Sequence, residues 1–150
     1  MNKTLAIAAL LAVAATGCGT PGVPDAVWHD MDPAGWPYDN VIEFAGPADS
    51  AAFDSVAITV RHSSAYAYSN LWLEVAYATA DTTAADTFNI MLADPFGHWF
   101  GKGSGLSFQR TDTLALSHTP NPGTAVKVRH VMRVDTLRDI EQLGLSPIHH

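Results

Sequence analysis

The alternation of apolar and polar side chains is the feature of this sequence that most restricts its fold. Leu71, Leu73 and Val75, for example, alternate with Trp72 and Glu74. Successive side chains of a β-strand point to opposite faces, so each such segment predicts a strand with one face toward a core and one toward solvent. The segments with this pattern are 56–61, 71–77, 88–92 and 126–134.

Shorter strands are expected between sequences rich in Gly and Pro, which favour turns. They are predicted at 41–44, 99–102, 108–116 and 143–148, and one helical turn is predicted at 137–142. About seven to nine evenly spaced strands without long helices predict an all-β fold, an antiparallel β-sandwich with jelly-roll-like topology.

The N-terminus has the composition of a secretion signal. Met1-Asn2-Lys3 carries one positive side chain, and residues 5–15 are apolar without interruption. A charged start followed by an apolar run of about 7–15 residues is typical of a signal peptide. The run is too short to cross a bilayer, which takes about 20 apolar residues. We therefore expect residues 1–17 to be a signal peptide.

Cys18 is the only cysteine of the chain and follows this signal directly. The sequence Ala15-Thr16-Gly17-Cys18 resembles a lipobox, in which small residues precede a cysteine that is lipidated before cleavage. The alternative is an ordinary secretory signal with an incidental cysteine. The resemblance implies two or three acyl chains, such as palmitate, on Cys18. Two or more chains anchor a protein stably, so the lipid bilayer is an expected partner through acylated Cys18.

The rest of the chain is long enough for one domain. Residues 18–27 contain Pro and Gly and little to bury, which predicts a flexible tether, and residues 28–150 form the expected sandwich domain. The formal net charge of the chain is −7. A nucleic-acid-binding protein needs a basic surface, so no nucleic-acid partner is expected.

Three groups of motifs follow one another along this domain. The first is Arg-His at 61–62 with Tyr-Ala-Tyr-Ser-Asn-Leu-Trp-Leu at 66–73. The second is Asp-Thr at 86–87 and Leu-Ala-Asp at 92–94, followed by Gly-His-Trp-Phe-Gly-Lys-Gly-Ser-Gly at 97–105. The third is Val-Met-Arg at 131–133 with Leu137, Ile140 and Gly144.

In this order, behind a lipobox, the motifs resemble those of the gliding-motility lipoprotein GldH family of Bacteroidetes-type bacteria. Three positions depart from the family pattern. His62 stands where the pattern has Asn, Asp139 where it has Gly, and Leu143 where it has Val. The chain is therefore identified as a divergent member.

The resemblance implies a non-enzymatic envelope lipoprotein, an accessory component of a gliding-motility and surface-export machinery. It also implies anchoring in the outer membrane and other envelope lipoproteins or membrane proteins as partners. No acidic residue follows Cys18 until Asp25, which favours the periplasmic face over the cell surface. The alternative function is a glycan-binding β-sandwich module at the cell envelope, with polysaccharide as the ligand, an analogy drawn from the fold alone.

Aromatic residues in the first two motif groups are the candidates for binding. Tyr and Trp give a large, rigid contact area with a polar group, and they are enriched in binding hot spots. Aromatic residues also lock the corners of β-sandwiches, which is the structural alternative. The candidate partner- or glycan-binding residues are Tyr66, Tyr68, Asn70, Trp72, Trp99 and Lys102.

Several charged residues and one histidine have structural interpretations. Arg61 and Arg133 are predicted to face solvent, either as plain surface charge or in ion pairs with Asp94 or Asp86. His130 falls on the apolar face of its segment and is expected to be a hydrogen-bonded core residue rather than a ligand.

No catalytic residue, metal or cofactor is expected. Asp94 and His98, with Asp86, could form an acid–base set, but no nucleophile motif accompanies them, and a divergent hydrolase is the third hypothesis. His29, Asp30 and Asp32 lie close together in irregular chain, where the defined geometry of a metal site is not expected.

Overall fold

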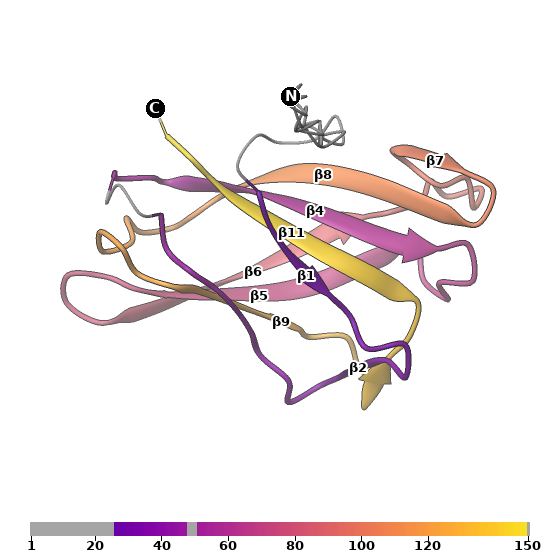
Figure 1. Cartoon of the computed structure of the whole chain (residues 1–150), viewed down its shortest axis with the longest axis horizontal. Coiled ribbons are helices and arrows are strands. Elements are labelled where there is room, and N and C mark those ends of the chain that lie inside the picture. The colour runs from indigo at the N-terminus through magenta and orange to yellow at the C-terminus, as the bar shows by residue number, and fades with distance from the viewer. Residues whose placement is uncertain (1–25, 48–50, 150) are drawn as a thin grey trace, which may run out of the picture.

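The computed structural model describes residues 26–47 and 51–149, which form an all-β fold without a helix. The predicted signal peptide, Cys18 and most of the tether fall on residues 1–25, outside the described residues. The strands lie in two main layers, and every strand pairing is antiparallel (Figure 1). The predicted antiparallel β-sandwich is confirmed.

The first sheet has five strands in the order β1-β11-β4-β8-β7. Their bounds are β1 Val27–Asp30, β11 Ile140–Ile148, β4 Ser55–Ser63, β8 Ser107–Ala115 and β7 Lys102–Ser104. β4 is the central strand and pairs along its length with β8 on one side and β11 on the other.

The second sheet has four strands in the order β3-β9-β5-β6. Their bounds are β3 Ile42–Phe44, β9 Val126–His130, β5 Asn70–Ala78 and β6 Thr83–Met91. A two-stranded ribbon joins β2 Trp36–Pro37 to β10 Thr136–Leu137.

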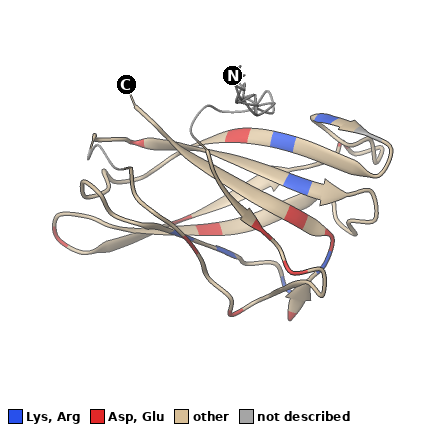
Figure 2. Cartoon of the chain, in the orientation of Figure 1, with Lys and Arg blue, Asp and Glu red and all other residues tan. Residues whose placement is uncertain are grey.

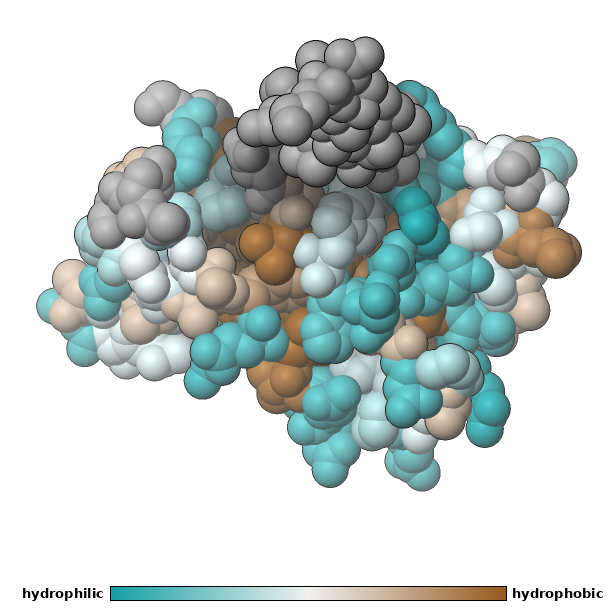
Figure 3. All heavy atoms as spheres, viewed as in Figure 1, coloured by the Kyte–Doolittle hydropathy of each residue, from teal (hydrophilic) through white to brown (hydrophobic). Residues whose placement is uncertain are grey.

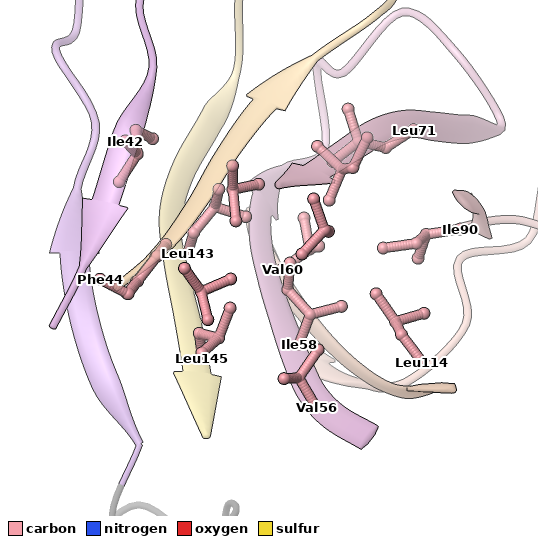
Figure 4. Close-up of a cluster of buried hydrophobic side chains, with 14 of the residues drawn as sticks. Ile42, Phe44, Val56, Ile58, Val60, Leu71, Ile90, Leu114, Leu143 and Leu145 are labelled. Atoms are coloured by element: carbon pink, nitrogen blue, oxygen red, sulfur yellow. The ribbon is translucent and has the colours of Figure 1, made fainter. Parts of the chain in front are cut away.

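Apolar side chains from the facing sides of the two sheets meet in one core (Figure 4). β4 contributes Val56, Ile58 and Val60, and β5 contributes Leu71 and Leu73, all 0% exposed. Burying such a side chain fully is worth about 1.5–3 kcal/mol. A shift of either strand by one residue would turn its apolar set outward, so the core fixes the register of both.

β4 is also buried on its second face, so the predicted solvent-facing side of 56–61 was wrong. Ala57 is 4% and Thr59 2% exposed. Thr59 pairs with Gly144 of β11, which pairs with Trp28 of β1. A Cβ on Gly144 would lie 3.0 Å from the Trp28 ring. Because Gly144 has no side chain, the Trp28 indole can lie over the sheet beside Thr59. Burial of Thr59 by a residue of another strand cannot be read from the alternation of residues 56–61.

The helical turn predicted at 137–142 does not form. Thr136 and Leu137 belong to β10, and β11 begins at Ile140. Between them Asp139 has a φ of 69°, a left-handed conformation that ends any helix and that Asp tolerates better than most residues. The Asp139 carboxylate and carbonyl both accept hydrogen bonds from Ser63, at 2.9 Å each.

Two further predicted strands have different bounds. β9 ends at His130, so residues 131–134 leave the sheet instead of continuing it. β7 begins at Lys102, and Trp99 forms only an isolated bridge with Ala93. The edge strand β1 was not predicted, because its four residues are all exposed and show no alternation.

Adjacent positions on β5 test the register. Leu73 is 0% exposed and Trp72 is 40% exposed. Leu73→Ala should lower the free energy of unfolding by about 2–5 kcal/mol, because it leaves a core cavity. Trp72→Ala removes more atoms but should cost less than Leu73→Ala. Urea unfolding followed by circular dichroism measures both, and equal losses would contradict the assigned faces.

Candidate functional site

The two motif segments rich in aromatic residues lie side by side at one end of the sandwich. The backbone N–H groups of Leu92 and Ala93 donate to the Ser69 carbonyl, at 2.7 and 3.0 Å. The Ser64 N–H donates to the Leu106 carbonyl at 2.8 Å. These bonds bring together residues 64–69, 92–101 and 105–106, which we call the loop end.

Tyr66 and Trp99 face inward at the loop end and have structural roles. Tyr66 is 4% exposed, and its hydroxyl donates to the Asn70 carbonyl at 2.9 Å. Burial raises the pKa of Tyr66, with the neighbouring Tyr68 adding to the effect. The Trp99 ring lies 4.5 Å from the ring of His62, which is fully buried, and 6.0 Å from that of Phe108. The two candidates therefore close the end of the core.

Tyr68 and Trp72 point to solvent and line a shared hollow of about 580 Å³ on the outer face of the second sheet. They are 38% and 40% exposed. Thr87 and residues 131–134, the segment that leaves the sheet after β9, complete its walls. We call this concavity the Trp72 hollow, and it has the size of pockets that bind small ligands.

Asn70 and Lys102 occupy different surroundings. The Asn70 side-chain amide donates to the Asn89 side-chain oxygen at 2.7 Å. Asn89 is the cross-strand partner of Trp72, so this amide pair lies beside the hollow. Lys102 is exposed on β7, at the edge of the opposite sheet. The six predicted binding residues therefore divide between the hollow and its border, the core, and the opposite sheet.

The three residues expected in ion pairs have separate surroundings. Arg61 donates to the side-chain oxygens of Gln142 and Gln109, at 2.7 Å each. The Gln142 amide also donates to the Asp30 carboxylate. This polar row crosses β1, β11, β4 and β8 on the outer face of the first sheet. Arg133 lines the hollow, and its guanidinium has no ion pair within the described residues.

Asp94 shapes a turn at the loop end. Its carboxylate accepts backbone N–H bonds from Phe96 at 2.9 Å and His98 at 2.8 Å, and it lies 2.9 Å from His98 Nδ1. The hydrogen bond from the His98 backbone is the main cause that lowers the pKa of Asp94. Gly97, with φ +85°, completes the turn. The turn holds Phe96 at its tip with 86% of its surface exposed.

The other charged and metal-ligand candidates make local hydrogen bonds within the described residues. The Asp86 carboxylate accepts hydrogen bonds from the Tyr77 hydroxyl and the Ser117 N–H, at 2.6 and 2.9 Å, apart from the Asp94 turn. Within residues 26–47 and 51–149, no group of three or more His, Cys, Asp or Glu residues could hold a metal ion. Asp32 instead accepts a hydrogen bond from the Ala34 N–H at 2.8 Å.

Sequence reasoning missed two exposed apolar side chains and the true position of Arg133. Phe96 and Leu106 are 86% and 77% exposed at neighbouring turns. Both stand beside glycines in turn sequences, and an apolar residue at a turn tip is the signal that could have found them. Arg133 was missed as a hollow residue because the segment after His130 was taken for strand.

Two further properties of the described residues concern the positions of their charges and helices that could cross a membrane. Figure 2 shows the Lys and Arg positions scattered singly among acidic ones on the strands. The described strands therefore carry no continuous basic stripe in this view. The described residues also form no helix that could span a membrane.

His130 lies in the core, as predicted. It is 0% exposed, and its Nε2 is 3.0 Å from the Trp36 carbonyl. A carbonyl only accepts, so Nε2 carries the proton of the neutral ring. Burial lowers the pKa of His130, and the nearby Arg129 charge adds to the effect, partly opposed by the bond to Trp36.

The family comparison gives a match that covers most of the chain. The model of the GldH lipoprotein family matches residues 26–146, which include the loop end, the Trp72 hollow and both sheets except the last two residues of β11. Comparison with curated proteins and with solved structures found no match.

The buried His130 predicts a pH dependence of stability. The unfolded chain binds a proton at His130 below about pH 6.5, while the lowered pKa keeps the ring neutral in the folded protein. The folding free energy that this neutral ring contributes is therefore complete above about pH 6.5 and is lost as the pH falls toward the folded pKa, by up to about 1.4 kcal/mol per pH unit. Urea midpoints at about pH 7.5 and 5.5, on either side of the unfolded pKa, should differ less in His130→Gln than in the native protein. An equal difference would show that other groups cause the loss.

Proposed function

We infer the function from one fact: this chain belongs to the GldH lipoprotein family. It is a gliding-motility-associated lipoprotein by family, and so a membrane-anchored protein of the cell envelope. We propose further that it is a non-enzymatic accessory component of a gliding-motility and surface-export machinery, attached to the outer membrane on the periplasmic face. The family match over 26–146 is the observation that carries this proposal.

The proposed anchor is acylated Cys18. Support comes from the sequence before it, a short charged start, an apolar run at 5–15 and small residues at 15–17. A chain with a formal net charge of −7 gains nothing from anionic lipid headgroups. Attachment therefore depends on the acyl chains.

The proposed protein contact is the loop end. Among the described residues, Phe96 and Leu106 are the most exposed of the large apolar side chains, and both are carried on short turns. Burying an exposed aromatic and an aliphatic anchor in a partner is the usual origin of hot-spot energy. His98 is also exposed there, and its pairing with Asp94 at 2.9 Å helps to hold the turn. We therefore propose other envelope lipoproteins or membrane proteins as partners at this end.

Cys18→Ser tests the anchor. The serine hydroxyl cannot replace the thiol that accepts lipid, so metabolic labelling with a palmitate analogue should drop to background. The domain should also appear as unprocessed precursor or leave the membrane fraction. The matched control is Thr16→Ser, which introduces the same residue type two positions earlier, keeps a small side chain there and should retain the label. Labelling that survives Cys18→Ser would refute the lipobox interpretation.

Phe96→Ser combined with Leu106→Ser tests the protein contact. Each hot-spot side chain is worth about 2 kcal/mol or more, so the pair should weaken partner recovery more than about 100-fold if the effects add. Recovery is measured by affinity purification of the lipidated protein from its own envelope, with quantification of the co-purifying proteins.

Val41→Ser is the control for this experiment, because Val41 is 46% exposed and lies before β3, outside the loop end. The double variant should unfold at the same urea concentration as the native protein, since neither side chain is buried. Undiminished partner recovery by the folded double variant would contradict the proposed contact.

A further inference from the structure

The Trp72 hollow has an exposed aromatic side chain, and the residues beside it are held to β5 by contacts with its backbone. Trp72 is 40% exposed, while its backbone N–H lies 3.3 Å from the Sδ of Met132, which is 7% exposed. Val131 donates its N–H to the Trp72 carbonyl at 2.9 Å. These contacts hold residues 131–134, which line one side of the hollow, against the strand β5 that carries Trp72. The hollow is therefore a fixed feature of the fold.

The aromatic surface suits the face of a sugar ring. The face of an indole carries negative charge density from its π electrons. The C–H groups on one side of a pyranose carry partial positive charge and form a flat apolar face that can stack on it. Tyr68 provides a second aromatic wall, 38% exposed, with a hydroxyl that can donate or accept.

Arg133 gives the hollow a positive charge. It is the only charged residue among the described residues that line the hollow, and no carboxylate lines it. The whole chain has 15 acidic and 8 basic residues, so a positive wall stands against the overall charge. An acidic group on this face is Glu74, the cross-strand partner of Thr87. Glu74 is neutralised by Arg129 at 2.8 Å, so it does not offset Arg133.

A guanidinium without an ion pair selects its ligand by geometry. Arg presents two parallel N–H groups that match the two oxygens of a carboxylate. The hollow and its border supply neutral hydrogen-bonding groups, the hydroxyl of Thr87 and the amide pair of Asn70 and Asn89. Such groups pair with sugar hydroxyls.

The dimensions favour a small, polar ligand over a protein surface. The hollow has a volume of about 580 Å³, within the range of about 300–1,000 Å³ for small-ligand pockets. A stable protein interface buries about 800 Å² on each partner, whereas among the described residues only two large apolar side chains with substantial exposure, Tyr68 and Trp72, line the hollow. The face in Figure 3 shows apolar residues in separate patches among hydrophilic ones.

We propose that the Trp72 hollow binds a carboxylate-bearing sugar residue of a polysaccharide. The sugar ring stacks on Trp72, its carboxylate pairs with Arg133, and its hydroxyls bond to Thr87 and the neighbouring amides. This site shares Tyr68 with the loop end but includes neither Phe96 nor Leu106, and it does not depend on the proposed protein contact.

A glycan array tests the proposal with the mature lipidated chain in detergent micelles. The array carries oligosaccharides with uronic or nonulosonic acids, the same oligosaccharides with the carboxyl group reduced to an alcohol, and short acidic peptides. Loss of one good contact of about 1.4 kcal/mol is a tenfold change in affinity. We therefore expect binding to at least one acidic oligosaccharide, with the Kd at least about 10-fold higher for its reduced form. Trp72→Ala and Arg133→Gln should each raise the Kd by a similar factor.

Lys102→Gln is the matched control for Arg133→Gln, because it removes the same charge from the exposed edge of the other sheet. It should leave the Kd unchanged. Trp72→Phe guards against loss of folding by Trp72→Ala, since it keeps an aromatic platform and should retain part of the affinity. Retained partner recovery by Trp72→Ala would show that the two surfaces act separately.

Three outcomes would overturn the proposal. The first is no binding to any acidic oligosaccharide on the array. The second is binding that the Trp72 and Arg133 variants leave intact, or that the reduced oligosaccharide matches. The third is binding of acidic peptides in place of saccharides, which would assign the hollow to a protein ligand.

Discussion

The close packing of β4 against β5 is the interaction on which the rest of the fold depends. Each is an inner strand of its sheet, and Ile58 and Leu73 are among the fully buried side chains of the core between the sheets. Every other strand of the two sheets gains its position by pairing outward from these two. The loop end follows from the same arrangement, because the residues after β4 and before β5 reverse the chain directly above the core, where Tyr66 closes it.

Alternation in the sequence predicted the sandwich, because in a β-strand every second side chain lies on the same face. The prediction failed where a segment distant in sequence determines which residues are buried or how the backbone turns. Leu137 and Ile140 have the spacing of one helical face, yet both are buried, at 1% and 5% exposure, through the left-handed turn at Asp139. A Gly at this position would suit the same φ without a Cβ penalty. Gly144 likewise makes room for Trp28, a contact between strands that are distant in sequence.

The candidate site was predictable in its residue types but not in its grouping. Tyr68 and Trp72 were predicted because they are Tyr and Trp residues of the motif groups, which offer a large, rigid contact area with a polar group. Tyr66 and Trp99 carry the same chemical signal, and only the structure shows that they turn inward. Arg133 joins the exposed pair because β9 ends at His130, whose buried bond to the Trp36 carbonyl fixes the last position of the strand. The residues after His130 no longer pair as a strand, and they line the side of the hollow instead.

The placement of the first strand bears on how a tethered domain would present these surfaces. β1 is an edge strand of the first sheet, whereas the Trp72 hollow opens on the outer face of the second sheet. With the anchor proposed at Cys18, the chain from there to Ala26 reaches at most about 30 Å. With the proposed anchor, the bilayer surface therefore lies within about 30 Å of the start of β1. The core lies between β1 and the outer face of the second sheet, so the proposed anchor leaves the hollow able to face away from the lipid, toward the proposed polysaccharide.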